Sequence, residues 1–323
     1  MAYILTVTPS PALDATTSVP TLKPFSKLRC GPMLRHPGGG GVNVARVIQR
    51  LGGDVLAVYP AGGAIGQLVR QLLDAEGVNS LVIPVAPETR EDFTVFEDST
   101  RKQYRFVLPG EKLTVSEWQP LIDAVSKATP APAFVVASGS LPPGVPADFY
   151  ARVVRAGRAR GAKVIVDTSH EALDAALDAG GIYLIKPSMS EFRTLTGVAD
   201  DADQPTLIAA GRAMIARGAV ELVALSMGPS GALLISRDHA WHAEGMTLDP
   251  ASVVGAGDSL VAAMVWRLAE GASLEDALRF GVAAGSAALL NPGTSLCQRQ
   301  DIDKFVPQIR LRDVGAMSSV AIG

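Results

Sequence analysis

Short apolar runs alternate with longer amphipathic segments along most of the chain. Runs rich in β-branched residues predict buried strands at 3–8, 55–59, 133–137, 163–167, 182–185 and 221–226. Apolar residues at helical spacing predict helices at 42–51, 66–76, 116–127, 146–160, 170–179, 256–270 and 274–290. This alternation predicts right-handed βαβ units, and so a doubly wound α/β domain whose mostly parallel sheet has helices on both faces.

Two segments depart from this alternation and predict a small β-rich lid. Residues 16–37 alternate polar and apolar positions and contain four prolines, which indicates edge strands and loops. Residues 92–107 have the pattern of a hairpin with one solvated face. We therefore expect one domain at 1–309 that carries this lid, followed by a loose tail of small residues at 310–323.

Composition narrows the class of protein. The chain has 323 residues, 48% of them hydrophobic and 19% charged, with a net charge of −3. Because no long basic stretch is present, we expect neither a nucleic-acid partner nor an anionic membrane surface. No apolar run reaches the roughly 18 residues of a membrane-spanning helix. Two cysteines without metal-site spacing, and an N-terminus without a signal-peptide pattern, lead us to expect a cytoplasmic protein.

The strongest local signal is the turn Gly255-Ala256-Gly257 followed by Asp258, where a helix is predicted to begin. Backbone amides at such a helix start can hold an anion, and the helix dipole adds to the attraction. A carboxylate beside an anion site can take a proton from an alcohol, which suits phosphoryl transfer to a hydroxyl group. The alternative is that Asp258 only caps the helix.

A second glycine-rich turn, Gly38–Gly41, precedes the helix predicted over 42–51. Four consecutive glycines cost backbone entropy, which a close approach to a ligand would explain. Asn43 follows and offers both a donor and an acceptor to sugar hydroxyls. The alternative is a flexible loop with a helix cap.

Two further turns follow predicted strands. Glu191 lies early in a helix, where its carboxylate either holds hydrated Mg²⁺ or is simply favoured by the helix dipole. The segment Leu225–Ala232 is either a cradle for a nucleotide phosphate or ribose, or an ordinary hairpin turn.

Single polar residues near the predicted strands also have two interpretations each. Asp14 follows the first strand and either binds sugar hydroxyls or belongs to a turn. Arg90 and Arg105 suit bidentate contact with a phosphate, although most arginines are solvated surface groups. Ser138 lies after a buried strand, in either a site loop or a plain turn.

The two glycine motifs together resemble the two signatures of the ribokinase-like (PfkB) carbohydrate kinase family. The resemblance spans about residues 2–306. The chain has none of the P-loop, protein-kinase, GxGxxG or GxSxG signatures of other enzyme classes. Within the family, the fourth glycine of the first turn and the segments Tyr104–Gly110, Ser138–Val145 and Arg279–Ala287 are most similar to the type 2 6-phosphofructokinase branch.

The resemblance implies a ribokinase-like fold and an ATP-dependent kinase that phosphorylates fructose 6-phosphate at its C1 hydroxyl. Asp258 would be the general base, and the amides of Gly255, Ala256 and Gly257 would hold the migrating phosphoryl group. The residues implied for the sugar phosphate are Asp14, Gly39, Gly40, Asn43, Arg90, Arg105 and Ser138. A kinase for tagatose 6-phosphate or fructose 1-phosphate, and a non-catalytic sugar-phosphate sensor, remain alternatives.

The resemblance also implies sites for ATP and for cations. The residues implied for ATP are Lys186, Ser188, Ser226, Gly228 and Gly231, with Lys27 reaching ATP across a homodimer interface formed by the lids. Mg²⁺ would be held by Glu191 through water. A K⁺ site would form from backbone groups near Ser252, Val254, Ala288, Asn291, Gly293 and Ser295.

One position departs from the family pattern. The family's Asn-x-x-Glu motif is present here as Ser188-Met-Ser-Glu191. Serine is shorter than asparagine and offers no amide, although its hydroxyl can bond one of the waters that organise Mg²⁺ and phosphate. The departure predicts retained activity with a weaker response to Mg²⁺ or ATP.

Overall fold

The centre of the fold is a sheet whose inner strands are apolar on both faces. β1 (Ile4–Val7) is fully buried because it lies between β4 (Val55–Ala61) and β8 (Phe134–Ser138). Such continuous apolar runs are typical of parallel sheets covered by helices. The computed structural model describes residues 2–315, and within them this sheet has ten strands.

The strand order across the described part of the sheet is β14-β13-β12-β11-β10-β9-β8-β1-β4-β5. The strands from β11 to β5 run parallel, whereas β12, β13 and β14 add an antiparallel edge. The remaining strands are β5 (Ser80–Pro84), β9 (Lys163–Asp167), β10 (Ile182–Ile185), β11 (Val220–Ser226), β12 (Ala232–Ile235), β13 (Ala240–Ala243) and β14 (Leu311–Asp313).

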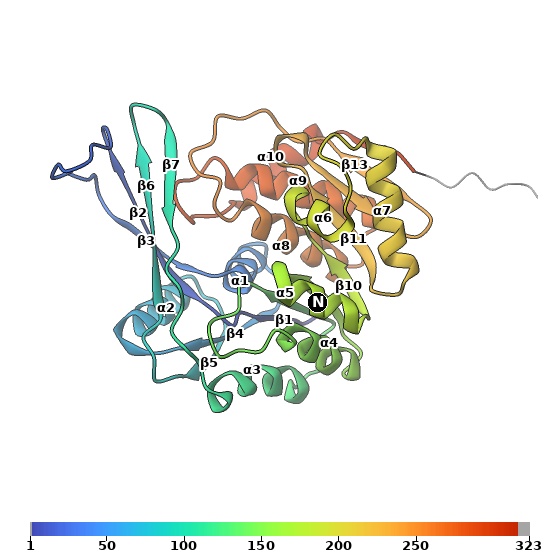
Figure 1. Ribbon diagram of the computed structural model, residues 1–323, viewed down its shortest axis with the longest axis horizontal. Helices are drawn as coiled ribbons and strands as arrows, with labels where there is room; N and C mark the ends of the chain where they lie inside the picture. Colours follow the sequence, from blue (N-terminus) through green and yellow to red (C-terminus); the bar gives the residue numbers. More distant parts are fainter. Residues whose placement is uncertain (1, 316–323) are drawn as a thin grey trace, which may run out of the picture.

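Helices cover both faces of this sheet (Figure 1). One face is packed by α1 (Gly40–Arg50), α2 (Gly63–Ala75), α8 (Ala256–Ala269), α9 (Leu274–Ala288) and α10 (Arg299–Phe305). The other is packed by α3 (Val115–Lys127), α4 (Phe149–Ala159), α5 (His170–Ala179), α6 (Met189–Thr196) and α7 (Gln204–Ala216). Short 3₁₀ turns lie at η1 (Gly228–Ser230) and η2 (Val306–Gln308). The predicted doubly wound, mostly parallel α/β architecture is confirmed.

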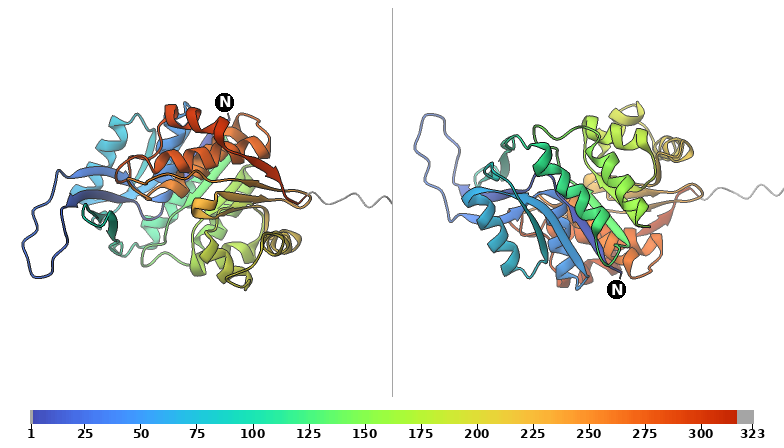
Figure 2. Two further views of the ribbon diagram at one scale, coloured as in Figure 1. Left: turned by 90° about the horizontal axis from the view of Figure 1, so that it is seen from above. Right: turned by 90° about the horizontal axis from the view of Figure 1, so that it is seen from below.

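A separate four-stranded sheet forms the lid in the described chain (Figure 1). Its order is β3-β2-β6-β7, with bounds Leu34–Gly38 (β3), Ala12–Val19 (β2), Arg90–Glu97 (β6) and Lys102–Phe106 (β7). β2 and β6 pair in parallel, and the other neighbours are antiparallel. Residues 20–33 join β2 to β3 as a loop that projects from the lid, as Figure 2 shows. The lid therefore lies where the sequence predicts it, although β2 and β6 begin earlier than expected.

Two predictions about local structure are wrong. The start of the expected loose tail is ordered, because Leu311–Asp313 pairs with β13 and Leu311 packs against the core; residues 316–323 lie outside the described residues. Asp14 lies inside strand β2 and not in a turn. Across residues 2–315, no helix has the length and hydropathy that crossing a bilayer requires.

Candidate active site

One cavity of about 260 Å³ lies between the lid and the carboxyl ends of the central strands. In open parallel sheets this edge is where ligands bind. The predicted site residues that line the cavity are Gly39, Gly40, Asn43, Arg90, Arg105, Ser138, Lys186, Glu191, Val254, Gly255 and Asp258. The structure thus brings together residues that lie far apart in the sequence.

Asp258 points into this cavity from the first turn of α8. Gly255 precedes the helix and has a φ of 78°, a left-handed conformation that favours glycine. A Cβ at this position would also lie 2.3 Å from Cδ2 of Leu296, so a larger residue does not fit. Asp258 is the third residue of the helix and makes no capping hydrogen bond, so the cap interpretation is wrong. Its Oδ2 accepts a hydrogen bond of 2.8 Å from Nδ2 of Asn43.

The protonation of Asp258 suits a general base. Burial, and after it the nearby Asp167 carboxylate, raise the pKa of its carboxyl to about 6. The hydrogen bond from Asn43 and the charge of Lys186 act in the opposite direction. At neutral pH the group is therefore ionised, yet more basic than an ordinary aspartate.

Lys186 supplies a positive charge beside the glycine turn. It directly follows β10, and its Nζ lies 3.3 Å from Oδ1 of Asp167, the last residue of the neighbouring strand β9. A Cβ on Gly257 would lie 3.2 Å from the same nitrogen, so the lysine packs against that turn. Burial opposes the charge, but Asp167 and Asp258 outweigh it and raise the pKa of Lys186. The lysine thus stays cationic.

The first glycine turn is a tight connection and not a flexible loop. Gly38 ends β3, and Gly40 begins α1 two residues later. A Cβ on Gly40 would lie 2.1 Å from Oγ of Ser138, at the end of β8. Glycine therefore lets the start of α1 approach this strand end, where both residues face the cavity.

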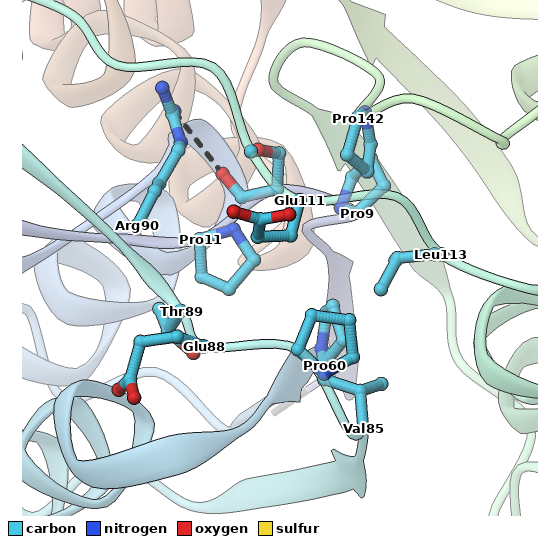
Figure 3. A pocket seen from close by; sticks show the side chains of 13 residues that line it. Pro9, Pro11, Pro60, Val85, Glu88, Thr89, Arg90, Glu111, Leu113 and Pro142 are labelled. Atoms are coloured by element: carbon cyan, nitrogen blue, oxygen red, sulfur yellow. Dashed lines mark hydrogen bonds between the residues drawn. The ribbon is translucent and has the colours of Figure 1, made fainter.

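Two arginines face the cavity from the lid. Nη1 of Arg90 donates to Oδ1 of Asp92 at 3.3 Å, and Nη2 of Arg105 lies 3.9 Å from the other oxygen of the same carboxylate. Arg90 is further held by the backbone carbonyls of Ser10 and Leu108, next to a small hollow of about 30 Å³ (Figure 3). This arrangement presents two guanidinium groups at one side of the cavity, as recognition of a phosphate requires.

Asp14 lies close behind this site, although it does not line the cavity. Its Oδ2 accepts a hydrogen bond of 2.5 Å from Oγ1 of Thr294. Burial raises the pKa of the Asp14 carboxyl, and the bond from Thr294 acts against the rise.

Glu191 faces the cavity but also caps its own helix. Its Oε2 accepts hydrogen bonds of 2.7 Å from both the backbone N–H and the hydroxyl of Ser188. This capping box shows why a glutamate suits the first turn of α6. Among residues 2–315 no three His, Cys, Asp or Glu side chains gather as a metal site. Mg²⁺ keeps several waters and needs only one or two carboxylates besides phosphates, so the cavity-facing Glu191 fits it.

Besides Lys186, the residues expected at the ATP site lie in three places outside the cavity lining. Ser188, shortly after β10, forms a β-bridge with Ser226, the last residue of the neighbouring strand β11. Gly228 and Gly231 lie in the turn between β11 and β12, so the hairpin interpretation describes its shape correctly. Lys27 lies in the exposed loop 20–33, and like the two glycines it is not part of the cavity lining.

The two segments expected to hold K⁺ meet after α9. The N–H of Ala251 donates to the carbonyl of Leu289 at 2.8 Å, which brings 252–254 beside 288–295. The carbonyl of Ser295 already accepts a hydrogen bond of 2.5 Å from Nη1 of Arg50. Gly293 packs against Thr16 of the lid.

Some residues around the cavity are not predicted from the sequence. They are Asp92, Gly139, Asp167, Thr168, Ser169 and, behind the cavity, Arg46 and Thr294. Asp167 could have been found, because it ends a predicted buried strand in the same way that Lys186 follows one. Asp92 and Arg46 carry no such signal, since each lies within an ordinary strand or helix pattern.

Comparison with known proteins assigns the chain to a family. The pattern of the pfkB family carbohydrate kinases matches residues 14–301. ATP-dependent 6-phosphofructokinase isozyme 2 of Mycobacterium tuberculosis is 46% identical over 94% of this chain and 88% of its own length. The Escherichia coli protein of the same name is 42% identical over 94% of this chain and 98% of its own length.

The fold comparison agrees. Crystal structures of phosphofructokinase-2 from Escherichia coli, in complex with fructose 6-phosphate and with potassium, match with TM-scores of 0.88 and 0.89. They are 39% and 40% identical and cover 95% of this chain and 99% of theirs. The chain therefore belongs to the PfkB family of carbohydrate kinases, and the expected ribokinase-like fold is confirmed.

Proposed function

We propose that this protein transfers the terminal phosphoryl group of ATP to the C1 hydroxyl of fructose 6-phosphate. The observation that carries the proposal is a single cavity in which Asp258, at the start of α8, shares the lining with Arg90 and Arg105. Both relatives reported above are named ATP-dependent 6-phosphofructokinases, and the matching crystal structure holds fructose 6-phosphate. The geometry of the cavity and the similarity to these relatives thus favour the same reaction.

Asp258 is the general base. Asn43 holds Oδ2, so Oδ1 accepts the proton of the C1 hydroxyl as its oxygen forms a bond to the terminal phosphorus of ATP. The bond between that phosphorus and the oxygen bridging to ADP breaks in line, and ADP leaves. The raised pKa of Asp258, about 6, makes the carboxylate basic enough for this step.

The start of α8 stabilises the phosphoryl group in transit. The amides of Gly255, Ala256 and Gly257 lie at the positive end of the helix dipole, where an anion is favoured. Lys186 packs against Gly257 and contributes its charge at the same place. These groups are fixed in advance, so they stabilise the transition state without reorganisation.

The lid side of the cavity binds the sugar phosphate. Arg90 and Arg105 take the 6-phosphate as a charged pair held together by Asp92. Ser138, Asn43 and the amides of Gly39 and Gly40 contact the sugar hydroxyls, and Asp14, behind the cavity on the lid strand β2, reaches them as the lid closes. Closure of the lid over these groups excludes water, which would otherwise accept the phosphoryl group.

ATP and its cations lie along the ends of β10 and β11. Lys186, Ser188, Ser226, Gly228 and Gly231 line the nucleotide, and Lys27 reaches it from the lid of a second subunit. Glu191 would hold Mg²⁺ through water, and the ion would supply positive charge to the phosphates of ATP. Backbone groups at 252–254 and 288–295 would hold K⁺, and the Escherichia coli protein has been crystallised in complex with potassium.

The working form is a cytoplasmic homodimer joined through the lids. Apolar side chains that a monomer leaves exposed gather on the lid: Phe25, Leu28, Met33, Leu34, Tyr104, Phe106, Val107 and Leu108. Exposed apolar side chains that concentrate on one part of a protein are a mark of an interface. A second lid would cover it.

The test identifies the product. The protein is incubated with Mg²⁺-ATP and fructose 6-phosphate, and the product is analysed by ³¹P and ¹³C NMR. A new phosphate on C1, giving fructose 1,6-bisphosphate, is expected with the wild type and not with Asp258→Asn. Phosphorylation of another carbon, or ADP formation without a sugar product, would overturn the proposal.

A further inference from the structure

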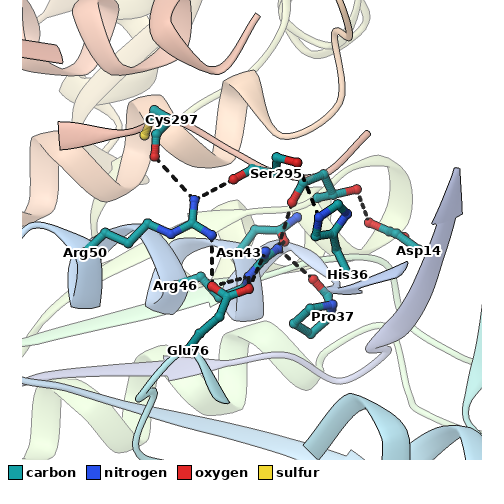
Figure 4. A network of polar contacts seen from close by, with 10 residues as sticks. Asp14, His36, Pro37, Asn43, Arg46, Arg50, Glu76, Ser295 and Cys297 are labelled. Atoms are coloured by element: carbon teal, nitrogen blue, oxygen red, sulfur yellow. Dashed lines mark hydrogen bonds and ion pairs between the residues drawn. The ribbon is translucent and has the colours of Figure 1, made fainter. Parts of the chain in front are cut away.

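Arg46 is a fully buried guanidinium behind the active site. It lies on α1 and is 0% exposed, so each of its donors must find an acceptor inside the protein. Figure 4 shows that it lies within a polar network that extends from α2 to the chain after α9. Neither its charge nor its position is used by the mechanism described so far.

Glu76 holds two of the guanidinium nitrogens. Nε of Arg46 lies 3.0 Å from both carboxylate oxygens, and Nη2 lies 2.7 Å from Oε1. Burial alone would raise the pKa of Glu76, but the hydrogen bonds and charges of Arg46 and Arg50 lower it below its ordinary value. The pair is therefore ionic, and the plane of the guanidinium is fixed by its fork-like contact.

The third nitrogen, Nη1, reaches three other segments. Its two hydrogens are shared among three acceptors: the carbonyls of Pro37 at 2.8 Å and Thr294 at 3.0 Å, and Oδ1 of Asn43 at 3.3 Å. Thr294 in turn donates its hydroxyl to Asp14. A single nitrogen thus joins the lid, α1 and the segment after α9 directly behind the substrate site.

The contact with Asn43 has a chemical consequence. An asparagine side chain has an acceptor and a donor end, and only its partners decide which way each end points. Arg46 has donors alone, so it requires Oδ1 on its own side. Nδ2 must then face Asp258, where it donates to Oδ2 at 2.8 Å.

We propose that Arg46, held by Glu76, is a positioning residue for phosphoryl transfer that orients the Asn43 amide toward Asp258. The catalytic carboxylate is thereby held at Oδ2 and presents Oδ1 to the substrate hydroxyl. This inference rests on the proposed function, because it gives Arg46 a role only through the base Asp258.

The first test is a double-mutant cycle between Arg46 and Asn43. Arg46→Lys keeps the positive charge beside Glu76, but one ammonium cannot serve Glu76 and Asn43 together. We expect kcat to fall about tenfold, the size of losing one hydrogen bond to a charged group. In an Asn43→Ala background, Arg46→Lys should lower kcat little further, because the amide that Arg46 orients is already absent. An equal loss in both backgrounds would overturn the proposal.

Arg50→Lys is the matched control. Arg50 pairs with the same carboxylate of Glu76, at 2.9 Å, but its other partners are the carbonyls of Ser295 and Cys297 and not Asn43. Because Arg50 also contacts the Ser295 carbonyl of the proposed K⁺ site, kcat is measured at saturating K⁺, where we expect it to stay within about twofold of the wild type. A tenfold loss here would assign the effect to the ion pair as a whole and contradict a specific role for Arg46.

A second readout does not need turnover or Arg46 itself. The Asp258 carboxyl is titrated by ¹³C NMR in the wild type, in Arg46→Lys and in Glu76→Asp, which keeps its charge but shortens the fork. The hydrogen bond from Asn43 lowers the pKa of Asp258, so losing this donor should move the titration of Asp258 to higher pH. The other charged groups that face Asp258, namely Asp167, Lys186 and Asp14, are unchanged in these variants. An unmoved titration in whichever variant folds would refute the role of Arg46, even if fructose 6-phosphate proves not to be the substrate.

Discussion

Asp258 carries a negative charge where burial and a second carboxylate, Asp167, both oppose it. The rise of its pKa from 3.8 to about 6 corresponds to at most about 3 kcal/mol of lost stability when the group is ionised in both folded and unfolded states. This cost already includes the hydrogen bond from Asn43 and the charge of Lys186, both of which lower the pKa. The basicity that favours catalysis is thus obtained at the expense of stability, as is common in active sites.

Replacing Asp258 with asparagine should separate these two effects. Turnover is expected to fall by about 10²–10⁴-fold, the usual contribution of a general base, while the sugar phosphate still binds. The free energy of unfolding at neutral pH should be about 1 kcal/mol higher for the variant than for the wild type, because the buried charge is gone. Calorimetry and steady-state kinetics measure both, and near-normal turnover would refute the assignment of the base.

The pH dependence of stability has a definite sign. Below about pH 6 the folded protein protonates Asp258, while the unfolded chain stays ionised down to about 3.8. The destabilising contribution of the carboxylate is therefore fully present above pH 6 and disappears as the pH falls toward 3.8. The stability difference between wild type and Asp258→Asn should shrink over this window in denaturant titrations. A difference independent of pH would contradict the raised pKa.

At the scale of an element, the start of α6 combines a structural and a chemical task. Ser188 and Glu191 cap the helix reciprocally, and the same Glu191 faces the cavity proposed for Mg²⁺-ATP. The resemblance described above leads us to expect asparagine where this chain has Ser188. Asparagine is also a good helix cap, so its amide can be restored without loss of the helix start.

Ser188→Asn should therefore change the cation response and leave the fold intact. We expect half-maximal activity at a lower Mg²⁺ concentration, with thermal stability close to that of the wild type. Ser188→Ala is the control, because it removes the cap at a cost of about 1 kcal/mol and supplies no amide. Activity is measured across a Mg²⁺ titration at fixed ATP. Superimposable curves for wild type and Ser188→Asn would contradict this role.

The sequence predicts strongly periodic elements well and weakly marked ones poorly. Strands such as Ile4–Val7 and helices such as α8 are found because their apolar residues are continuous or periodic. α7 is missed, since Pro205 and Gly211 look like helix breakers. In the structure Pro205 lies in the first turn, where no N–H is needed, and Gly211 packs closely against Ile235. Tertiary packing thus decides what local pattern leaves open.

The same limit applies to the site. Glycine turns and residues after strands are visible in the sequence because backbone geometry demands them, as for Gly40 and Lys186. Contacts such as Arg46 with the carbonyl of Thr294 join residues 248 positions apart, and no local pattern records them. Most residues that line the cavity could therefore be predicted, whereas buried contacts behind it, such as those of Arg46, could not.

At the scale of the whole molecule, the exposed apolar lid is the feature that a single chain leaves incomplete. Phe25, at the loop between β2 and β3, is fully exposed and has a φ of 56°. Phe106 on β7 is also exposed and lies on the same lid sheet. Lid-to-lid pairing would cover both and would bring Lys27 to a neighbouring subunit.

Phe25→Asp is expected to weaken the dimer without disturbing the fold. Aspartate tolerates a positive φ, so the loop keeps its shape while a charge enters the apolar surface. Sedimentation should show a dimer for the wild type and a concentration-dependent monomer for the variant, with a higher KM for ATP. Val115→Asp, a charge added at an exposed position outside the lid, is the control and should remain dimeric. A wild-type monomer at micromolar concentrations would contradict the interface.

The most direct test of the central claim compares kcat/KM for four acceptors: fructose 6-phosphate, tagatose 6-phosphate, fructose 1-phosphate and ribose. Purified protein is assayed with ATP and Mg²⁺ by coupled detection of ADP. A clear preference for fructose 6-phosphate, abolished by Asp258→Asn, is the predicted result. A preference for another sugar would contradict the substrate assignment while keeping Asp258 as base. Binding of the sugar phosphates without turnover on any of them would contradict the assignment as a kinase and favour a sensor.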